Sequence, residues 1–145
     1  MSVLIDSNVL LRRAQPAHPA HVSAVQSVAR LLARGVPVYF TPQNITEFWN
    51  VATRPAEING LGLPYETVAA EVAIIEGLLT FLPDSPAIFP EWKRLITQYR
   101  VTGVKVHDAR LAAIASVYGV KSILTFNGGD FARFKHLAVL HPSEV

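Results

Sequence analysis

Four acidic residues of this chain lie beside apolar segments rather than in charged runs: Asp6, Glu47, Asp108 and Asp130. The protein has only 11 acidic residues among 145 and contains no cysteine. Without thiolates, any metal chemistry must use oxygen or imidazole ligands, and the histidines show no zinc spacing. Mg²⁺ takes oxygen ligands, so these carboxylates are the first candidates for chemistry.

Asp6 directly follows the apolar residues 3–5, a run that is too short for a helix and is β-branched at two of its three positions. Such a run predicts a buried strand. An ionised carboxylate next to a buried strand costs much free energy unless it is exposed, paired or bound to a metal. Asp6 could instead cap a helix that starts near Val9, since Asp is a good N-cap residue. The stretch by itself leaves both interpretations open.

The elements that must position these acids alternate along the chain. Strands are predicted at residues 3–5, 36–40, 81–82, 122–126 and 137–140, and helices at 8–13, 20–33, 42–53, 65–79, 88–100 and 108–118. Strands separated by helices favour parallel pairing, because parallel neighbours need a crossover connection. We therefore expect one domain over residues 1–145, with a three-layer α/β/α fold and a central, mostly parallel sheet.

In open parallel sheets, ligands bind beyond the C-terminal ends of the strands, near the point where the strand order reverses. Asp6 ends the first predicted strand, and Asn127 and Asp130 follow the strand at 122–126. If these strands are neighbours, their loops face one crevice. Asp108 begins a predicted helix, where it could also be an ordinary acid favoured by the helix dipole. We expect His107 beside it to be a surface or packing residue.

Glu47 is the least obvious candidate. The apolar side of its predicted helix is formed by other residues: Ile45, Phe48, Trp49 and Ala52. Periodicity alone predicts that Glu47 is exposed to solvent, or that it belongs to a capping box with Asn44. A polar helix face can also line a cleft, so the pattern does not decide its role.

Taken in order, these residues resemble the PIN-domain family, and within it the VapC-like toxin ribonucleases, over essentially the whole chain. Four motifs carry the resemblance: an opening strand that ends in D-S-N, an acid in the helix after the second strand, an H-D-A-x-L-A-A helix start, and a T-x-N-x-x-D-F turn. The resemblance implies a Rossmann-like fold whose acidic cluster binds Mg²⁺ or Mn²⁺ and is used to cut RNA.

Position by position, Asp6, Glu47 and Asp108 match the first three acidic residues of the family. The fourth position, often Asp, is Asn127 in this chain, and Asp130 follows in the same turn. Asn can ligate Mg²⁺ through its carbonyl oxygen but adds no charge, so either residue could fill the place. The resemblance implies Asp6 and Asp108 as main metal ligands, with Glu47 and the fourth residue orienting the water that attacks an RNA phosphodiester in line.

Two further sets of residues are expected to support this chemistry. Polar side chains at family-typical positions, expected to orient the acids and the loop, are Ser7, Asn8 and Thr125. Cations near the acids in sequence, expected to contact RNA phosphates, are above all Arg12, Arg54 and Arg110, followed by Arg13 and Arg133. Any single arginine of this set could equally belong to an ordinary solvated surface.

The predicted function is therefore a metal-dependent endoribonuclease that acts as the toxin of a type II toxin-antitoxin pair. The resemblance also implies an antitoxin of the VapB type and a homodimer, for which residues 68–82 could supply an apolar face. A formal net charge of +2 suits a polyanionic partner but is too small to establish one. No signal pattern is present, and no segment approaches the roughly 20 apolar residues of a membrane span, so we expect a cytoplasmic protein.

Two other classes of function compete with this prediction. The first is a catalytically degenerate PIN-fold module that binds RNA or protein, which Asn127 favours and the three other acids oppose. The second is a nucleotide-binding Rossmann domain, which the missing glycine fingerprint disfavours. No P-loop or G-x-S-x-G motif is present either.

Overall fold

Five short strands form one parallel sheet in the order β3-β2-β1-β4-β5. The structure is a computed structural model that describes residues 1–145. The strands are β1 (Val3–Ile5), β2 (Val38–Phe40), β3 (Thr80–Phe81), β4 (Ser122–Leu124) and β5 (Ala138–Leu140). In the central register, Leu4 pairs with Tyr39 on one side and with Ile123 on the other. The predicted parallel sheet is confirmed.

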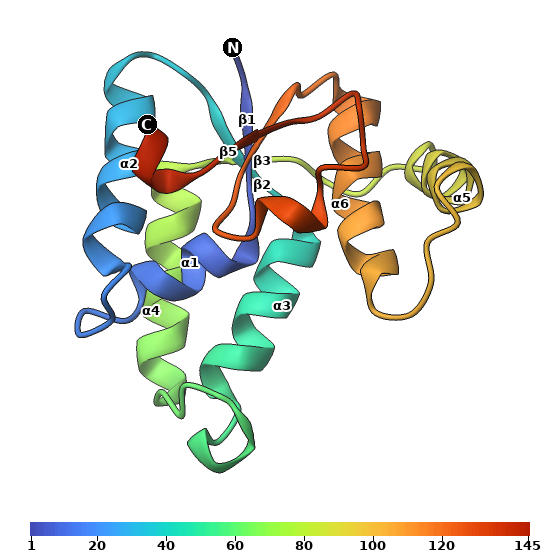
Figure 1. The fold of residues 1–145 in the computed structure, drawn as a ribbon. Coiled ribbons are helices and arrows are strands. Elements are labelled where there is room, and N and C mark those ends of the chain that lie inside the picture. The colour runs from blue at the N-terminus through green and yellow to red at the C-terminus, as the bar shows by residue number, and fades with distance from the viewer.

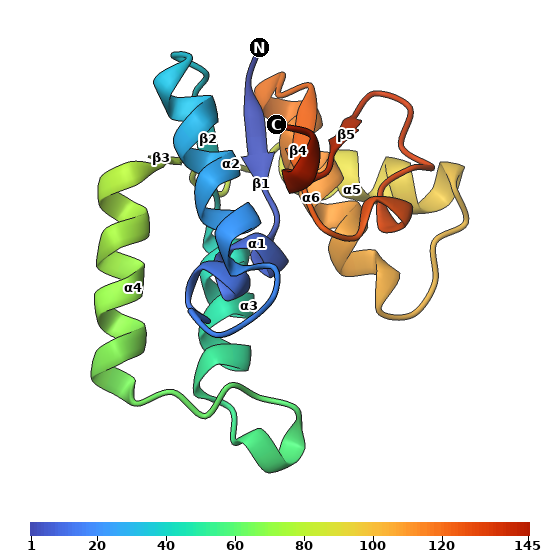
Figure 2. The same ribbon diagram turned by 60° about the vertical axis from the view of Figure 1, so that its left-hand side comes forward.

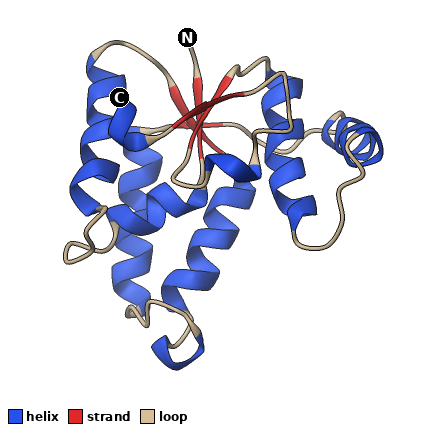
Figure 3. Ribbon diagram, in the orientation of Figure 1, coloured by secondary structure: helices blue, strands red, loops and turns tan.

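Six α-helices flank the sheet in two groups (Figure 1). They are α1 (Ser7–Arg13), α2 (His21–Ala33), α3 (Pro42–Thr53), α4 (Tyr65–Leu78), α5 (Ile88–Gln98) and α6 (Lys105–Tyr118). Short 3-10 turns span Ala56–Ile58, Gly128–Asp130 and Pro142–Glu144. Helices α1 to α4 cover one face and α5 and α6 the other, with the strands between them (Figures 2 and 3), as the three-layer prediction requires. No helix combines the length and the apolar character that a membrane span needs.

The central strand β1 explains why both faces need a layer of helices. Its three residues are fully buried. Val3 and Ile5 pack into the core formed with α1 to α4, whereas Leu4 packs into the core formed with α5 and α6. Side chains alternate between the two faces of a strand, so an entirely apolar strand requires cover on both sides. Each buried side chain of this size contributes about 1.5–3 kcal/mol.

Helix α3 begins where the Thr-Pro signature predicts. The hydroxyl of Thr41 accepts a hydrogen bond from the backbone N–H of Asn44 (3.2 Å), and the Asn44 side chain accepts one from the backbone N–H of Thr41 (2.8 Å). Pro42 occupies the first helical turn, where its missing N–H costs nothing. This reciprocal pair is a capping box of Thr41 with Asn44. The predicted alternative of a capping box containing Glu47 is therefore wrong.

Helix α6 begins earlier than predicted, at Lys105 instead of Asp108. Gly103 turns the chain with φ +61°, and its carbonyl accepts a hydrogen bond from the backbone N–H of Val106 (3.2 Å). The N-cap residue is Val104, whose side chain makes no capping bond. The sequence therefore carries no capping signature at this boundary. Asp108 remains in the first helical turn.

The other predicted boundaries differ by one or two residues. Strand β2 begins at Val38, after Pro37, because proline has no N–H to donate to a strand ladder. Strand β4 ends at Leu124, two residues before the predicted end. Terminal residues of helices and strands commonly shift by this amount. The order and type of all predicted elements are confirmed.

Candidate functional site

The loops after β1 and β4 lie side by side at the centre of the sheet. From β1 the chain continues to β2 on one side, and it later returns to β4 on the other side, so strand order reverses between β1 and β4. The backbone N–H of Asp6 donates to the carbonyl of Leu124 (2.9 Å), which joins the two strand ends. The predicted crevice between these loops is confirmed, at the position where open parallel sheets bind ligands.

A cavity of about 280 Å³ opens at this point. Ten residues line it: Asp6, Ser7, Asn8, Leu11, Glu47, Asn50, Val51, Asp108, Asn127 and Asp130. All five residues predicted for the acidic site are among them, and they come from four separate segments of the chain. Ser7 and Asn8 also line the cavity, and Thr125 lies behind it as a fully buried residue.

Asp6 is both a helix cap and a cavity residue. Its Oδ1 accepts a hydrogen bond from the backbone N–H of Ser7 (2.7 Å) at the start of α1, and its Oδ2 accepts one from the Thr125 hydroxyl (2.7 Å). Burial raises the pKa of Asp6 to about 6; the two hydrogen bonds lower it, and the charges of Asp108 and Glu47 raise it again. The two interpretations of Asp6 that the sequence left open are therefore compatible.

Asp108 shares the unfavourable environment of Asp6. Burial raises its pKa to about 6, and repulsion from Asp130 and Glu47 adds to this, while Lys105 acts in the opposite direction. Asp130 forms an ion pair with Lys105 in the first turn of α6. Two carboxyl groups whose pKa values are raised, first by burial and then by neighbouring carboxylates, lie in one cavity, which is typical of a functional site.

Glu47 is half-buried and lines the cavity, so the exposed side chain that periodicity alone predicts is wrong, and the alternative of a polar helix face that lines a cleft holds. One carboxylate oxygen accepts from the Ser7 hydroxyl (2.7 Å), and the other accepts from the Gln43 side-chain amide (2.8 Å). Periodicity correctly placed Glu47 off the apolar face of α3. It could not show that the start of α1 lies across from that polar side.

Two of the three supporting residues, Asn8 and Thr125, form a hydrogen-bond network between the loops after β1 and β4, whereas the Ser7 hydroxyl bonds to Glu47 on α3. Asn8 donates to the Thr125 hydroxyl (3.1 Å) and accepts from the backbone N–H of Phe126 (3.3 Å). The Thr125 hydroxyl also accepts from the backbone N–H of Asn127 (3.0 Å), while it donates to Asp6. This network fixes the carboxylate of Asp6 and the backbone of Asn127 relative to each other.

The sequence interpretation missed three residues of the site. Asn44 is fully buried, and its side chain donates to the carbonyl of Ile5 (3.0 Å), which ties α3 to the end of β1. Gln43 lies four residues before Glu47, a spacing that places both on one side of a helix and could have been noticed. The sequence did not indicate Lys105, because its segment was predicted to be a loop.

None of the three main arginines predicted to bind RNA lines the cavity. Arg12 donates to the Gln15 side chain (2.6 Å), and Arg54 donates to the carbonyl of Asn59 (2.8 Å). Arg110 forms an ion pair with Asp84 (3.1 Å) and donates to the Gln43 side chain (3.2 Å). Lys105, in contrast, pairs directly with the cavity residue Asp130. The RNA-binding assignment of the arginines stays a prediction.

The donor set of the cavity fits a divalent cation, because carboxylate and amide oxygens are the ligands of Mg²⁺ and Mn²⁺. A cation would also offset both causes that raise the pKa values of Asp6 and Asp108, first the burial of the charged form and second the repulsion between the carboxylates. The acids do not converge closely enough for any three of them to form a ready-made metal site. Mg²⁺ commonly retains several waters, so a spacing that leaves room for bridging waters is compatible with it.

A family model described as PIN domain matches residues 3–137. The chain belongs to the PIN-domain family. The resemblance stated from the sequence motifs is thereby confirmed. No curated protein matches the sequence.

Solved structures show the same PIN fold. A VapBC2 complex from Rickettsia felis, bound to a DNA fragment from its promoter, superposes with a TM-score of 0.71 at 15% identity and covers 97% of this chain and 98% of that chain. VapBC-1 from nontypeable Haemophilus influenzae superposes with a TM-score of 0.70 at 15% identity, and the alignment covers 99% of both chains. VapC20 from Mycobacterium tuberculosis, described as a Sarcin-Ricin loop cleaving toxin, superposes with a TM-score of 0.68 at 15% identity. The alignment covers 91% of this chain and 95% of that chain. At these identities the likeness shows the fold.

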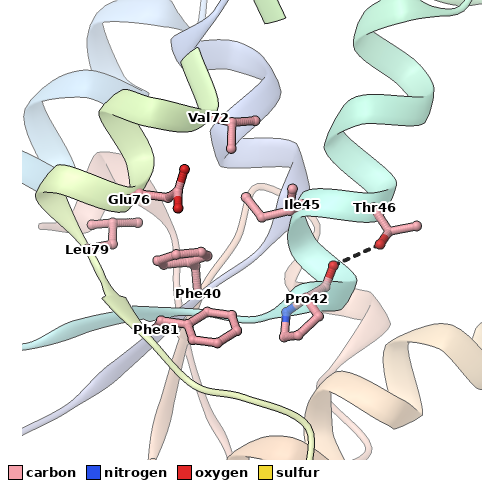
Figure 4. Close-up of a pocket in the computed structure, with 8 residues that line it drawn as sticks. All are labelled: Phe40, Pro42, Ile45, Thr46, Val72, Glu76, Leu79 and Phe81. Atoms are coloured by element: carbon pink, nitrogen blue, oxygen red, sulfur yellow. Dashed lines mark hydrogen bonds between the residues drawn. The ribbon is translucent and has the colours of Figure 1, made fainter. Parts of the chain in front are cut away.

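This PIN domain has a second, larger cavity of about 530 Å³ between α3, α4 and the sheet edge at β3 (Figure 4). Most of its lining is apolar: Phe40, Pro42, Ile45, Thr46, Val72, Glu76, Leu79 and Phe81. Glu76 is the only ionisable side chain among them. A single carboxylate in an apolar hollow gathers no metal ligands, so the smaller acidic cavity is the candidate site.

Proposed function

We propose that this PIN domain is a divalent-metal-dependent endoribonuclease that hydrolyses RNA phosphodiester bonds. Membership in the family supports a nuclease toxin in general terms. The observation that carries the specific proposal is the meeting of Asp6, Glu47, Asp108 and Asp130 in one cavity, although long stretches of sequence separate them. Carboxylates gathered at the switch point of a parallel sheet suit a cation and a phosphate better than any uncharged substrate.

Asp6 and Asp108 are the residues that would hold the metal, directly or through water. When bound, Mg²⁺ or Mn²⁺ supplies a Lewis acid that lowers the pKa of water and stabilises negative charge on a phosphate. Glu47, held by Ser7 and Gln43, would orient the attacking water for in-line displacement. Thr125 and the N–H of Ser7 keep both oxygens of Asp6 fixed while the charge around them changes.

Asp130 is the better candidate for the fourth acidic position. Both Asn127 and Asp130 line the cavity, but Asp130 carries a charge that already raises the pKa of Asp108. Its ion pair with Lys105 occupies one carboxylate oxygen, so Lys105 would compete with a metal ion for Asp130. We propose that Asn127 contributes at most a neutral oxygen, with Asp130 supplying the fourth carboxylate.

We also infer that the protein works as the toxin of a toxin-antitoxin pair in the cytoplasm, with an antitoxin of the VapB type. Support comes from the structural neighbours, among which are VapBC complexes from Rickettsia felis and Haemophilus influenzae. A homodimer is part of the same proposal. Residues 68–82, the predicted dimer face, expose the apolar side chains of Ile74, Leu78 and Phe81.

The experiment is cleavage of a panel of structured and single-stranded RNAs by purified protein with Mg²⁺, with Mn²⁺ and with EDTA. We expect metal-dependent cutting that EDTA abolishes. D6N and D108N should each slow the cutting by at least about 100-fold, because loss of a metal ligand costs no less activity than loss of a residue that hydrogen-bonds such a ligand. Glu57→Gln, an exposed acid outside the cavity, is the matched control and should cut at the wild-type rate. Folded D6N protein that cuts as fast as the wild type would contradict the assignment.

A degenerate binding module is the second candidate, and Asn127 at a position often filled by Asp is the observation that favours it. In that case, well-folded protein would bind RNA or a partner protein without cutting, and Mn²⁺ would not raise its melting temperature. Metal stabilisation without cutting of any RNA in the panel would instead indicate an active site with a narrow substrate range.

A further inference from the structure

We propose that Gln43 is a positioning residue of this site, and that Arg110 helps to hold its side-chain amide in the orientation that faces Glu47. The inference deepens the nuclease proposal and rests on it. Gln43 lies in the first turn of α3, directly after Pro42, and neither the sequence motifs nor the lining of the acidic cavity includes it.

All the hydrogen-bonding atoms at the end of the Gln43 side chain are engaged. Its Nε2 donates to Oε1 of Glu47 (2.8 Å) and to the backbone carbonyl of His107 (2.8 Å). Its Oε1 accepts from Nη1 of Arg110 (3.2 Å). A primary amide has two N–H donors and one carbonyl, so this arrangement uses both donors and the acceptor.

Only one orientation of the amide satisfies these partners. If the Gln43 amide were turned over, its carbonyl oxygen would face the Glu47 carboxylate and the His107 carbonyl, which only accept hydrogen bonds. Its NH₂ group would then face the Arg110 guanidinium, which only donates. The guanidinium of Arg110 and the two acceptors, Glu47 and the His107 carbonyl, therefore fix together which end of the amide points at Glu47.

The Gln43 amide connects the two helix layers at the edge of the site. Helix α3 packs on one face of the sheet and α6 on the other. Gln43 starts on α3, and its bond to the His107 carbonyl reaches α6 one residue before Asp108. Because the same NH₂ group also binds Glu47, it ties the Glu47 carboxylate to the helix that carries Asp108.

Glu47 is thereby held from both sides. Ser7, next to Asp6, donates to one carboxylate oxygen, and Gln43 donates to the other. A glutamate side chain has several rotatable bonds, and the nearby carboxylates of Asp6 and Asp108 repel it. Without Gln43, we expect Glu47 to leave the position from which it can orient a water molecule.

The first test is a double-mutant cycle between Gln43→Leu and Glu47→Gln, measured as kcat and KM on the RNA that the wild type cuts. We expect Gln43→Leu to lower kcat by about 10–100-fold, as loss of an outer-shell partner does, with KM within about threefold. In the Glu47→Gln background, the same substitution should lower kcat by less than about threefold, since the residue through which Gln43 acts is already disabled. Additive effects, or a kcat for Gln43→Leu within about twofold of wild type, would overturn the proposal.

Arg110 provides an independent arm. Arg110→Met should reproduce part of the kcat loss and should add little to Gln43→Leu. The matched control is Asp84→Asn, which breaks the ion pair of Arg110 but leaves its bond to Gln43. This substitution should leave kcat unchanged. A second control is Gln98→Leu, which removes an exposed glutamine on α5. If Asp84→Asn lowers kcat as much as Arg110→Met, the Arg110 part of the proposal is wrong.

Mn²⁺ affinity, measured by titration calorimetry on the four proteins of the cycle, separates the two proposals. If the wild type binds Mn²⁺ but cuts no RNA of the panel, the site has a narrow substrate range; a non-additive loss of Mn²⁺ affinity then supports Gln43 as a positioning residue, and an additive loss overturns it. If the wild type cuts RNA and the cycle is additive in both kcat and affinity, only the Gln43 proposal fails. A wild type that neither binds Mn²⁺ nor cuts RNA overturns both.

Discussion

The raised pKa of Asp6 predicts how the stability of the protein depends on pH. Burial lifts this pKa from 3.8 to about 6, so the folded state holds the Asp6 proton more tightly than the unfolded chain does. Stability therefore falls as the pH rises from about 4 to about 6, the interval in which the unfolded chain has lost this proton and the folded state still holds it. Above about pH 6 this contribution is constant.

The size of the effect follows from the shift. A change of about two pKa units corresponds to about 3 kcal/mol of unfolding free energy, at about 1.4 kcal/mol for each unit. The D6N variant carries no titratable group at this position and should keep the N-cap, because Asn caps helices about as well as Asp. Any loss of the hydrogen bond from Thr125 is the same at every pH. The stability of D6N relative to wild type should therefore increase by about 3 kcal/mol between pH 4 and pH 7.

Urea unfolding in EDTA, followed by the fluorescence of Trp49 and Trp92, measures this difference at each pH. With a typical urea dependence of about 1–3 kcal/mol per molar, the midpoint of D6N should move upward relative to wild type by at least about 1 M over the interval. Glu57→Gln serves as the control, and its offset from wild type should stay constant between pH 4 and pH 7. An offset of D6N that is equally independent of pH would refute the claim that Asp6 is an unfavourably buried charge.

Two further predictions concern the cation beside the site and the exposed apolar helix. Lys105→Met removes the partner of Asp130, so we expect tighter Mn²⁺ binding in calorimetry. It also removes a cation, so we expect weaker RNA binding, with a plot of log binding constant against log salt concentration whose slope is smaller by about one. Unchanged Mn²⁺ and RNA binding would leave Lys105 as an ordinary surface residue. The second prediction is that the protein alone is a dimer in light scattering and that Ile74→Glu combined with Leu78→Glu makes it monomeric while leaving it folded, because charge on a buried apolar contact is strongly unfavourable. A wild type that is monomeric at micromolar concentration would contradict the proposed dimer.

Much of the fold could be predicted from local sequence. Strand β1 confirms the prediction from the apolar run at residues 3–5, and α3 confirms the helix start predicted at Thr41-Pro42. The parallel sheet confirms the prediction from alternating short and long segments. Each of these patterns depends only on residues that are neighbours in the chain. The predicted start of α6 was wrong for a local reason, because the N-cap residue Val104 has no side chain that can cap a helix. Motif order was enough to indicate the family before any contact was known.

The site itself depended on tertiary structure. The periodicity of a helix tells which of its faces is polar, but it cannot tell what lies opposite that face. The sequence therefore left open whether Glu47 is exposed or lines a cleft, and the structure places it against Ser7. Likewise, Gln43 and Lys105 gain their roles only from α6 and from the loop after β4. The order of the strands decides these contacts, because it places β4 beside β1 and brings together carboxylates that are about 20 to 120 residues apart in the chain. The sequence by itself determined which side chains this protein has for chemistry, and the packing of two helix layers across one sheet determined which of them meet.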